Sequence, residues 1–189
     1  MPGVALSGRA FIFGKLPRHG DFVARGLDSD ARAYWDEALS DRLARAREAY
    51  GTAFVAAHEA SLPWRFISGP GPLGPDWRVG VVSPSVDGVG REFFIVVGVA
   101  GLSAPGQSLA NALAENLEIV TYDGLQQAWD ADDLTEAAQG VLERVTMVDP
   151  TVAESAERWW RADDLIAAAR MPDSLIEYPH LETPVQVLP

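Results

Sequence analysis

The sequence contains no cysteine, and its 15 basic residues include a single lysine, Lys15. The absence of cysteine excludes disulfides and thiolate metal sites, and it fits a reducing compartment. No apolar run approaches the roughly 20 residues that a membrane helix requires. The first residues also lack the charged and apolar regions of a secretory signal. We therefore expect that the protein is neither exported by a secretory signal nor inserted into a membrane.

Basic residues are scarce relative to acidic ones, at 15 against 27, which gives a formal net charge of -12. Residues 1–100 hold 11 of each sign, whereas residues 101–189 hold 4 basic and 16 acidic residues. Nucleic acid binding needs a basic face, so we expect no nucleic acid partner. The acidic second half either steers a basic partner or simply keeps the surface solvated.

Apolar residues, in contrast, are plentiful enough for one hydrophobic core. They make up 48% of the 189 residues and include 6 Trp and 7 Phe. This length suits one domain. The sequence shows no internal repeat and no low-complexity linker, so we predict a single domain over residues 1–189.

The order of apolar patterns predicts an α/β fold of the α+β kind. Buried or alternating strands are predicted at residues 10–13, 64–67, 77–82 and 91–99. The last three are joined by short links, which favours an antiparallel meander. Helical spacing of apolar residues occurs at residues 31–50, 108–122 and 133–145. These elements predict one mixed, largely antiparallel sheet with helices packed on it.

Weaker patterns complete the prediction. Asp28 and Asp132 are expected to cap helices. A short helix is expected at residues 52–61, a turn at 83–90 and a helix at 163–170. The apolar continuity of residues 91–99 predicts a central strand or one that helices cover on both faces.

The loop that follows the first strand gathers charge. Lys15, Arg18, His19, Asp21 and Arg25 fall within eleven residues. Glycine and proline between them shape the backbone. Functional residues tend to lie on such loops, because a rigid strand positions them.

Two groups of residues contain the side-chain types found in catalytic or metal sites. His19 and Asp21 resemble a fragment of a metal or hydrolase site, but a metal needs three or four converging ligands. A serine hydrolase would use Ser85 with His19 and either Asp21 or Asp87, although no nucleophile elbow is present. The favoured interpretation is that Asp21 and the segment around Asp87 stabilise turns. A phosphate loop at Lys15 is excluded because no Ser or Thr follows the lysine.

Three arginines, Arg25, Arg65 and Arg91, lie next to apolar segments. They could pair with Asp21 or Asp87 through bidentate contacts and would then join the two loops. The alternative is that they form a recognition surface. The pair Trp159-Trp160 presents a similar choice, since adjacent residues of a strand face opposite sides. We expect one of the two in the core. The other, for which Trp160 is the candidate, either lies in the core or contacts a partner protein.

Two long motifs resemble the signatures of the TagF family, accessory proteins of bacterial type VI secretion. The first is Phe13-Gly14-Lys15-Leu16-Pro17 followed by Gly20-Asp21-Phe22-Val23 and Arg25. The second runs from Trp64-Arg65-Phe66 through Trp77 and Gly80-Val81 to Ser83-Pro84-Ser85-Val86-Asp87 and Val89-Gly90-Arg91. The closing Trp159-Trp160 and Met171-Pro172-Asp173 are also similar to the family's pattern.

The resemblance implies a cytoplasmic, non-enzymatic post-translational repressor of type VI secretion that needs no cofactor or metal. It implies binding to the forkhead-associated scaffold protein of the apparatus. A structural subunit of the apparatus is the alternative. The resemblance and the loops together give these candidate residues for partner binding: Lys15, Arg18, Asp21, Arg25, Arg65, Ser83, Ser85, Asp87, Arg91 and Trp160.

The chain departs from the family pattern at two places. Gly88 stands where the family usually has arginine, which removes a charge from the second signature. Phe94-Ile95 replaces Pro-Leu, which keeps the apolar character of the strand.

Overall fold

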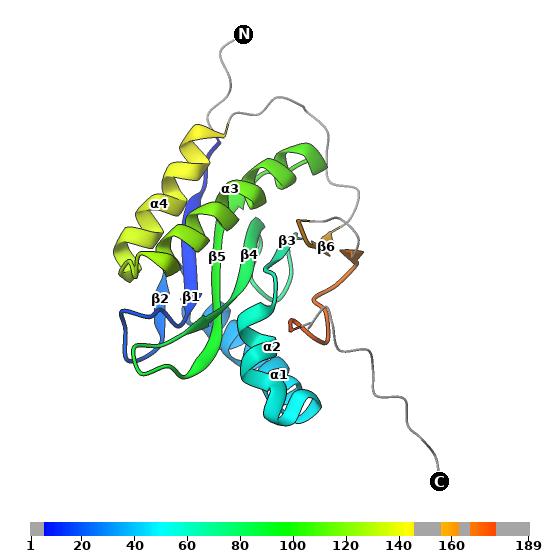
Figure 1. Ribbon diagram of the computed structural model, residues 1–189. Helices are drawn as coiled ribbons and strands as arrows, with labels where there is room; N and C mark the ends of the chain where they lie inside the picture. Colours follow the sequence, from blue (N-terminus) through cyan, green and yellow to red (C-terminus); the bar gives the residue numbers. More distant parts are fainter. Residues whose placement is uncertain (1–5, 146–155, 163–166, 177–189) are drawn as a thin grey trace.

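A computed structural model describes residues 6–145, 156–162 and 167–176. These residues form an α+β fold around one seven-stranded sheet with the order β2-β1-β5-β4-β3-β6-β7 (Figure 1). Every pair of neighbouring strands is antiparallel. The predicted meander is present as β3, β4 and β5, and the sheet is extended by β1 and β2 on one side and by β6 and β7 on the other.

The strands are β1 (Arg9–Gly14), β2 (Val23–Arg25), β3 (Trp64–Ser68), β4 (Trp77–Val86), β5 (Glu92–Leu102), β6 (Glu157–Trp160) and β7 (Ala167–Ala168). The helices are α1 (Ser29–Tyr50), the 3₁₀ turn η1 (Gly51–Ala53), α2 (Phe54–Ala60), α3 (Gln107–Gln126) and α4 (Ala131–Arg144). No helix in the described part of the chain is long and apolar enough to cross a membrane.

Both faces of the sheet are covered, which explains why β5 is apolar along almost its whole length. Helices α3 and α4 cover one face, where Ile12, Val81 and Val97 pack against Leu113 and Leu117. Figure 1 shows these two helices lying side by side across the strands. The structure thus confirms the prediction that this strand is either central or covered by helices on both faces, because β5 is an interior strand with helices on each side.

Helices α1 and α2 cover the opposite face. There Phe11, Phe66 and Phe94 pack against Trp35 and Leu39 of α1. Gly80 and Gly98 are register partners on β4 and β5, and a Cβ on either would approach the ring of Phe66 or Phe11 within 3 Å. Glycine at both positions therefore makes room for the aromatic layer.

Residues 171–176 complete the second core. Met171, Leu175 and Ile176 are buried in it. Arg42 Nε donates to the carbonyl oxygen of Pro172 at 2.8 Å, and the Tyr50 hydroxyl donates to that of Ile176 at 3.1 Å. The segment is thus fixed to α1 by side chains that the helix extends toward it.

Several boundaries differ from the sequence-based expectation. Asp28 caps α1 as expected, by accepting from the Ala31 amide at 2.8 Å. Asp130, and not Asp132, caps α4, because its carboxylate accepts from the amides of Asp132 and Asp133. The turn expected at residues 83–90 is shorter, because β4 continues to Val86 along β5.

The segment predicted as a helix at residues 163–170 lies partly outside the described residues. Its described part includes β7, which pairs with β6, so the helical prediction is wrong there. Trp159 and Trp160 lie on β6 and face opposite sides of the sheet, as a strand requires, but both are buried. Trp160 is therefore a core residue, because α3 and the neighbouring strands cover its face of the sheet.

Candidate functional site

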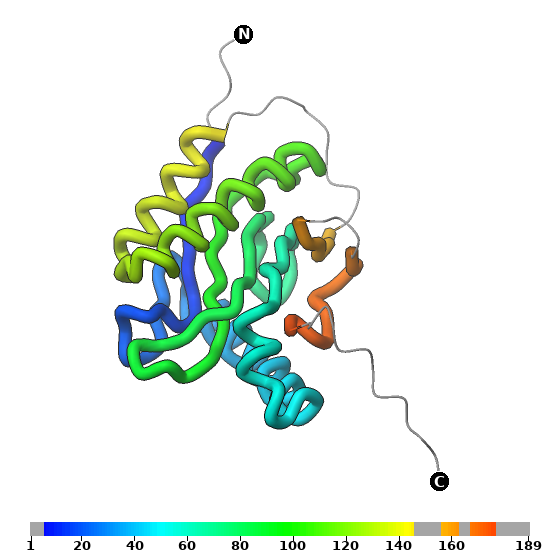
Figure 2. The backbone as a smooth tube through the Cα atoms, viewed as in Figure 1, coloured from blue at the N-terminus to red at the C-terminus, as the bar shows by residue number. Residues whose placement is uncertain are grey.

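The two signature segments meet at one end of the sheet. Strands β1 and β4 both run antiparallel to β5, so they run parallel to each other and their chains leave the sheet at the same end. The opening loop (residues 15–22) follows β1, and the Asp87–Arg91 turn follows β4. Figure 2 shows these two segments side by side.

One carboxylate connects the loop and the turn. Asp87 Oδ2 accepts from Lys15 Nζ at 3.0 Å and from Arg91 Nε at 2.6 Å. Asp87 Oδ1 accepts from the backbone amides of Val89 at 3.1 Å and Arg91 at 2.9 Å. The carboxylate is fully buried, and these four donors satisfy it.

Burial and hydrogen bonding act in opposite directions on this group. Burial raises the pKa of Asp87. Four hydrogen bonds lower the pKa by more than burial raises it; they come from the Arg91 amide, the Lys15 ammonium, the Arg91 guanidinium and the Val89 amide. The net result is that the pKa of Asp87 lies well below its usual range. Asp87 is therefore ionised at neutral pH, and its carboxylate organises the turn around itself.

Backbone contacts strengthen the junction. The Gly88 amide donates to the His19 carbonyl oxygen at 2.7 Å, and Arg91 Nη2 donates to that of Gly20 at 2.8 Å. The Ser85 hydroxyl donates to the Lys15 carbonyl oxygen at 2.6 Å. A Cβ on Gly88 would lie 3.2–3.3 Å from the carbonyl oxygens of Pro17 and His19, so glycine lets the turn approach the loop closely.

Two aromatic rings lie near the ammonium group of Lys15. Its Nζ lies 5.3 Å from the ring centre of Phe22 and 5.9 Å from that of Phe93. Phe22 also packs against Phe13 and Phe93, with ring centres 5.8 and 4.8 Å apart. Cation–π contacts thus add to the ion pair in holding the one lysine of the chain in place.

The three arginines expected to join the signatures have different partners. Arg91 pairs with Asp87, as expected. Arg25 instead pairs with Asp132 of α4 at 2.7 Å, and Arg65 pairs with Glu118 of α3 at 2.7 Å. The expectation is wrong for these two, because helices that are distant in sequence bring other carboxylates to them.

The remaining candidates lie around this junction. Arg18 and Asp21 are exposed, and Asp21 accepts from the amide of Phe22 at 2.7 Å. Ser83 is buried, and its hydroxyl lies 3.2 Å from the Pro84 carbonyl oxygen. Lys15, Ser83, Ser85 and Asp87 are all buried. They can influence a partner only through the shape of the loops that they hold.

The groups of the hydrolase alternative do not pair with one another in the hydrogen bonds of the structure. His19 Nε2 accepts from the Ala131 amide at 3.1 Å, which places it at the start of α4. Ser85 is bound to the Lys15 carbonyl, and Asp87 is bound to Lys15 and Arg91. Within the described residues no group of three or more potential ligands is placed to hold a metal ion.

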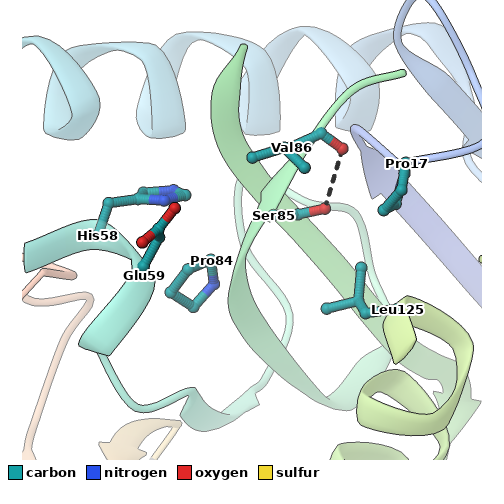
Figure 3. A pocket seen from close by; sticks show the side chains of 7 residues that line it. All are labelled: Pro17, His58, Glu59, Pro84, Ser85, Val86 and Leu125. Carbon is teal, nitrogen blue, oxygen red and sulfur yellow. Dashed lines mark hydrogen bonds between the residues drawn. The ribbon is translucent and has the colours of Figure 1, made fainter. Parts of the chain in front are cut away.

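A groove of about 270 Å³ borders residues 84–86 of β4, which pair with β5 but extend beyond the pairing with β3 (Figure 3). Its lining residues are Pro17, His58, Glu59, Pro84, Ser85, Val86 and Leu125. His58 and Ser85 both line it, but His58 Nε2 lies 2.6 Å from the Phe93 carbonyl oxygen, and Figure 3 shows the Ser85 hydroxyl pointing away from the imidazole. Neither arrangement provides a serine with a base.

His58 is a buried residue of this groove that no motif in the sequence identifies. Burial lowers its pKa, and the hydrogen bond to Phe93 only partly offsets that effect. It packs between Phe54 and Phe94 in the core between the sheet and helices α1 and α2. The sequence around His58 does not indicate whether the side chain is buried or exposed, because it is a single histidine in a short helix with no clear apolar pattern.

Family comparison agrees with the motifs. The chain matches the model of the TagF N-terminal domain, described as type VI secretion system-associated, over residues 11–141. Since this match includes most of the chain and both signatures, the protein belongs to that family. No curated protein is significantly similar in sequence.

The fold has a counterpart among solved structures. It is similar to PA0076 of Pseudomonas aeruginosa PAO1, whose crystal structure was determined at 2.05 Å resolution. The TM-score is 0.67 at 23% identity, and the match covers 86% of this chain and 89% of that chain. At this identity the similarity concerns the fold alone.

Proposed function

We propose that this protein restrains bacterial type VI secretion after translation, by binding the cytoplasmic forkhead-associated scaffold protein of the secretion apparatus. Membership of the TagF N-terminal family supports a role associated with that system. The repressor role and the scaffold are implied by the resemblance of the two signatures. The proposal treats the chain as a binding protein and not as an enzyme.

The convergence of the two signatures is the observation that carries the proposal. Lys15 and Asp87 are 72 residues apart, and the contacts of Asp87 and Arg91 with the opening loop join the two signatures at one end of the sheet. The buried ion pair between Lys15 and Asp87 lies at this end of the sheet. A rigid surface of this kind suits protein recognition, because little conformational entropy is lost when it binds.

Binding of the purified scaffold to the immobilised chain tests this function. We expect a saturable complex, measured by surface plasmon resonance or by calorimetry. The matched control is heat-unfolded chain on the same surface, which should retain no scaffold. Failure of the folded wild-type protein to bind at tens of micromolar scaffold would contradict the proposal, since specific interfaces of ordinary size have dissociation constants of about 1 μM or lower.

A further inference from the structure

Strand β4 continues beyond its neighbour β3 at the end of the sheet where the two signatures meet. The last register pair between these strands is Trp64 with Val82, whereas β4 pairs with β5 as far as Val86. The chain before β3 belongs to α2, which ends at Ala60, so it does not continue the strand. Within the described residues, the β3 side of residues 83–86 is therefore an open edge of the sheet.

The backbone groups of Pro84 and Val86 point toward this open edge. Successive residues of a paired antiparallel strand direct their N–H and C=O groups alternately to its two sides. The Asp87 amide donates to the Arg91 carbonyl oxygen at 3.2 Å, which is the β5 side. Because the direction alternates, the carbonyl oxygens of Pro84 and Val86 and the amide of Val86 face away from β5.

These backbone groups have few partners among the described residues. The Val86 amide donates to no acceptor outside the β4–β5 ladder, and its direction excludes that ladder. The carbonyl oxygens are approached by the hydroxyl of the preceding serine, at 3.2 Å for Pro84 and 3.5 Å for Val86. Proline suits such an edge, because it has no amide to leave unpaired. An edge with free donors and acceptors is where an added strand pairs.

The groove of Figure 3 occupies the position that a further strand would take. His58 and Glu59 of α2 line it, and so does Leu125 at the end of α3. These two helices cover opposite faces of the sheet. A groove bounded by both of them passes beside the edge of β4, whose residues Pro84 and Val86 also line it. The groove thus exposes the unpaired backbone groups to an incoming chain.

The walls of the groove indicate which side chains an incoming strand carries. Glu59 is exposed, is the one acidic or basic side chain apart from His58 in the lining, and forms no ion pair with the described residues. His58 stays neutral at neutral pH, because burial lowers its pKa. Leu125 on the opposite face is apolar. Since neighbouring residues of a strand face opposite sides, a basic residue next to an apolar one complements both walls.

We infer that an extended segment of the forkhead-associated scaffold adds to β4 as a further strand at residues 84–86, with a basic side chain at Glu59 and an apolar neighbour at Leu125. The inference deepens the proposed function and rests on it, because it takes the scaffold as the occupant. The segment donates to the carbonyl oxygens of Pro84 and Val86 and accepts from the Val86 amide. The main chain supplies affinity, and the two walls select the side chains.

Hydrogen exchange of the Val86 amide tests strand addition directly. NMR gives exchange rates of single amides for the labelled full chain, alone and saturated with unlabelled scaffold. We expect the Val86 amide to exchange about tenfold or more slowly in the complex, because a main-chain hydrogen bond protects it. Ser103 provides the control amide, since it is exposed and follows β5 at the opposite end of the sheet. Its rate should stay within about twofold.

Charge reversal tests the contact at Glu59. Glu115→Lys is the matched control for Glu59→Lys, because Glu115 is also an exposed helical glutamate and the net charge changes equally. Circular dichroism and the urea midpoint confirm that both variants fold. We expect Glu59→Lys to weaken scaffold binding about tenfold and Glu115→Lys to leave it within about twofold, since like charges in contact are unfavourable.

The outcomes separate this inference from the proposed function. Scaffold binding without slower exchange at Val86 overturns strand addition and leaves the proposed function intact. Equal effects of the two charge reversals also overturn the inference, because the loss is then not specific to the groove. A Val86 amide already protected in the free protein overturns it as well, since this chain or a second copy then covers the edge. Absence of wild-type binding overturns both the inference and the proposed function.

Discussion

The Asp87 carboxylate accepts a hydrogen bond from the Lys15 ammonium at 3.0 Å, although the two residues are 72 positions apart. Each residue belongs to a different signature of the family. Side-chain exposure is 10% for Lys15 and 0% for Asp87, so water contributes little to their solvation. The signatures are thus joined by a buried charge pair, and breaking one partner leaves the other uncompensated.

Asp87→Asn is expected to destabilise the fold. Asparagine keeps the size of the side chain but removes the charge that compensates Lys15 and Arg91. Urea unfolding followed by tryptophan fluorescence measures the change. Arg25→Gln is the control: it breaks an exposed pair with Asp132 and should change the free energy of unfolding by no more than about 1 kcal/mol. Equal midpoints for wild type and Asp87→Asn would show that the charge pair does not stabilise the protein.

The contribution of Asp87 to the free energy of unfolding should depend on pH. Because the folded pKa lies below the unfolded value of about 3.9, the unfolded chain binds the proton more readily. The stabilisation is present above the unfolded pKa and is lost as the pH falls through the folded pKa. Urea midpoints measured from about pH 5 downward should therefore fall more steeply for wild type than for Asp87→Asn. Parallel curves for the two proteins are the contradicting result.

His58 is expected to produce a separate pH dependence nearer neutrality. Burial lowers its pKa in the folded state, so below the unfolded value of about 6.5 the unfolded chain takes up a proton that the folded protein does not. Stability should therefore fall from about pH 7.5 to about pH 5.5. His58→Gln can still donate toward Phe93 and does not titrate, so its midpoint should change less over this interval. An equal change in both proteins would remove His58 as the cause.

The tryptophan pair should contribute to both cores independently. Trp159 stacks on Phe66 with ring centres 4.9 Å apart, and Trp160 packs in the α3–α4 core. Trp159→Ala and Trp160→Ala are each expected to cost roughly 3–5 kcal/mol in the free energy of unfolding. Chemical denaturation measures both. A Trp160 variant as stable as wild type would contradict its placement in the core.

Much of the fold is predictable because local patterns and tertiary packing agree. The meander follows from three apolar runs with short links, and α1 follows from the spacing of Trp35, Leu39 and Leu43. Strand β2 has only three residues, and its pairing with β1 comes from the return of the loop. Strand β7 likewise exists only because β6 lies beside it. Such elements depend on partners that a single sequence does not display.

The site was predictable in part for the same reason. The motifs located the two loops, and the pairing of Arg91 with Asp87 needs only four residues of separation. The partner of Arg25 depends on where α4 begins, and that of Arg65 on how α3 crosses the sheet. The role of Lys15 also required the structure, since its partner Asp87 lies in the turn that follows β4, 72 residues away.

Secretion by the intact bacterium tests the central claim most directly. The chromosomal gene is deleted and then complemented with wild type at its normal protein level, and secreted type VI substrate is quantified. We expect that deletion raises secretion and that complementation with wild type lowers it again. Secretion that stops on deletion would contradict the account, because that result identifies a structural part of the apparatus and not a repressor.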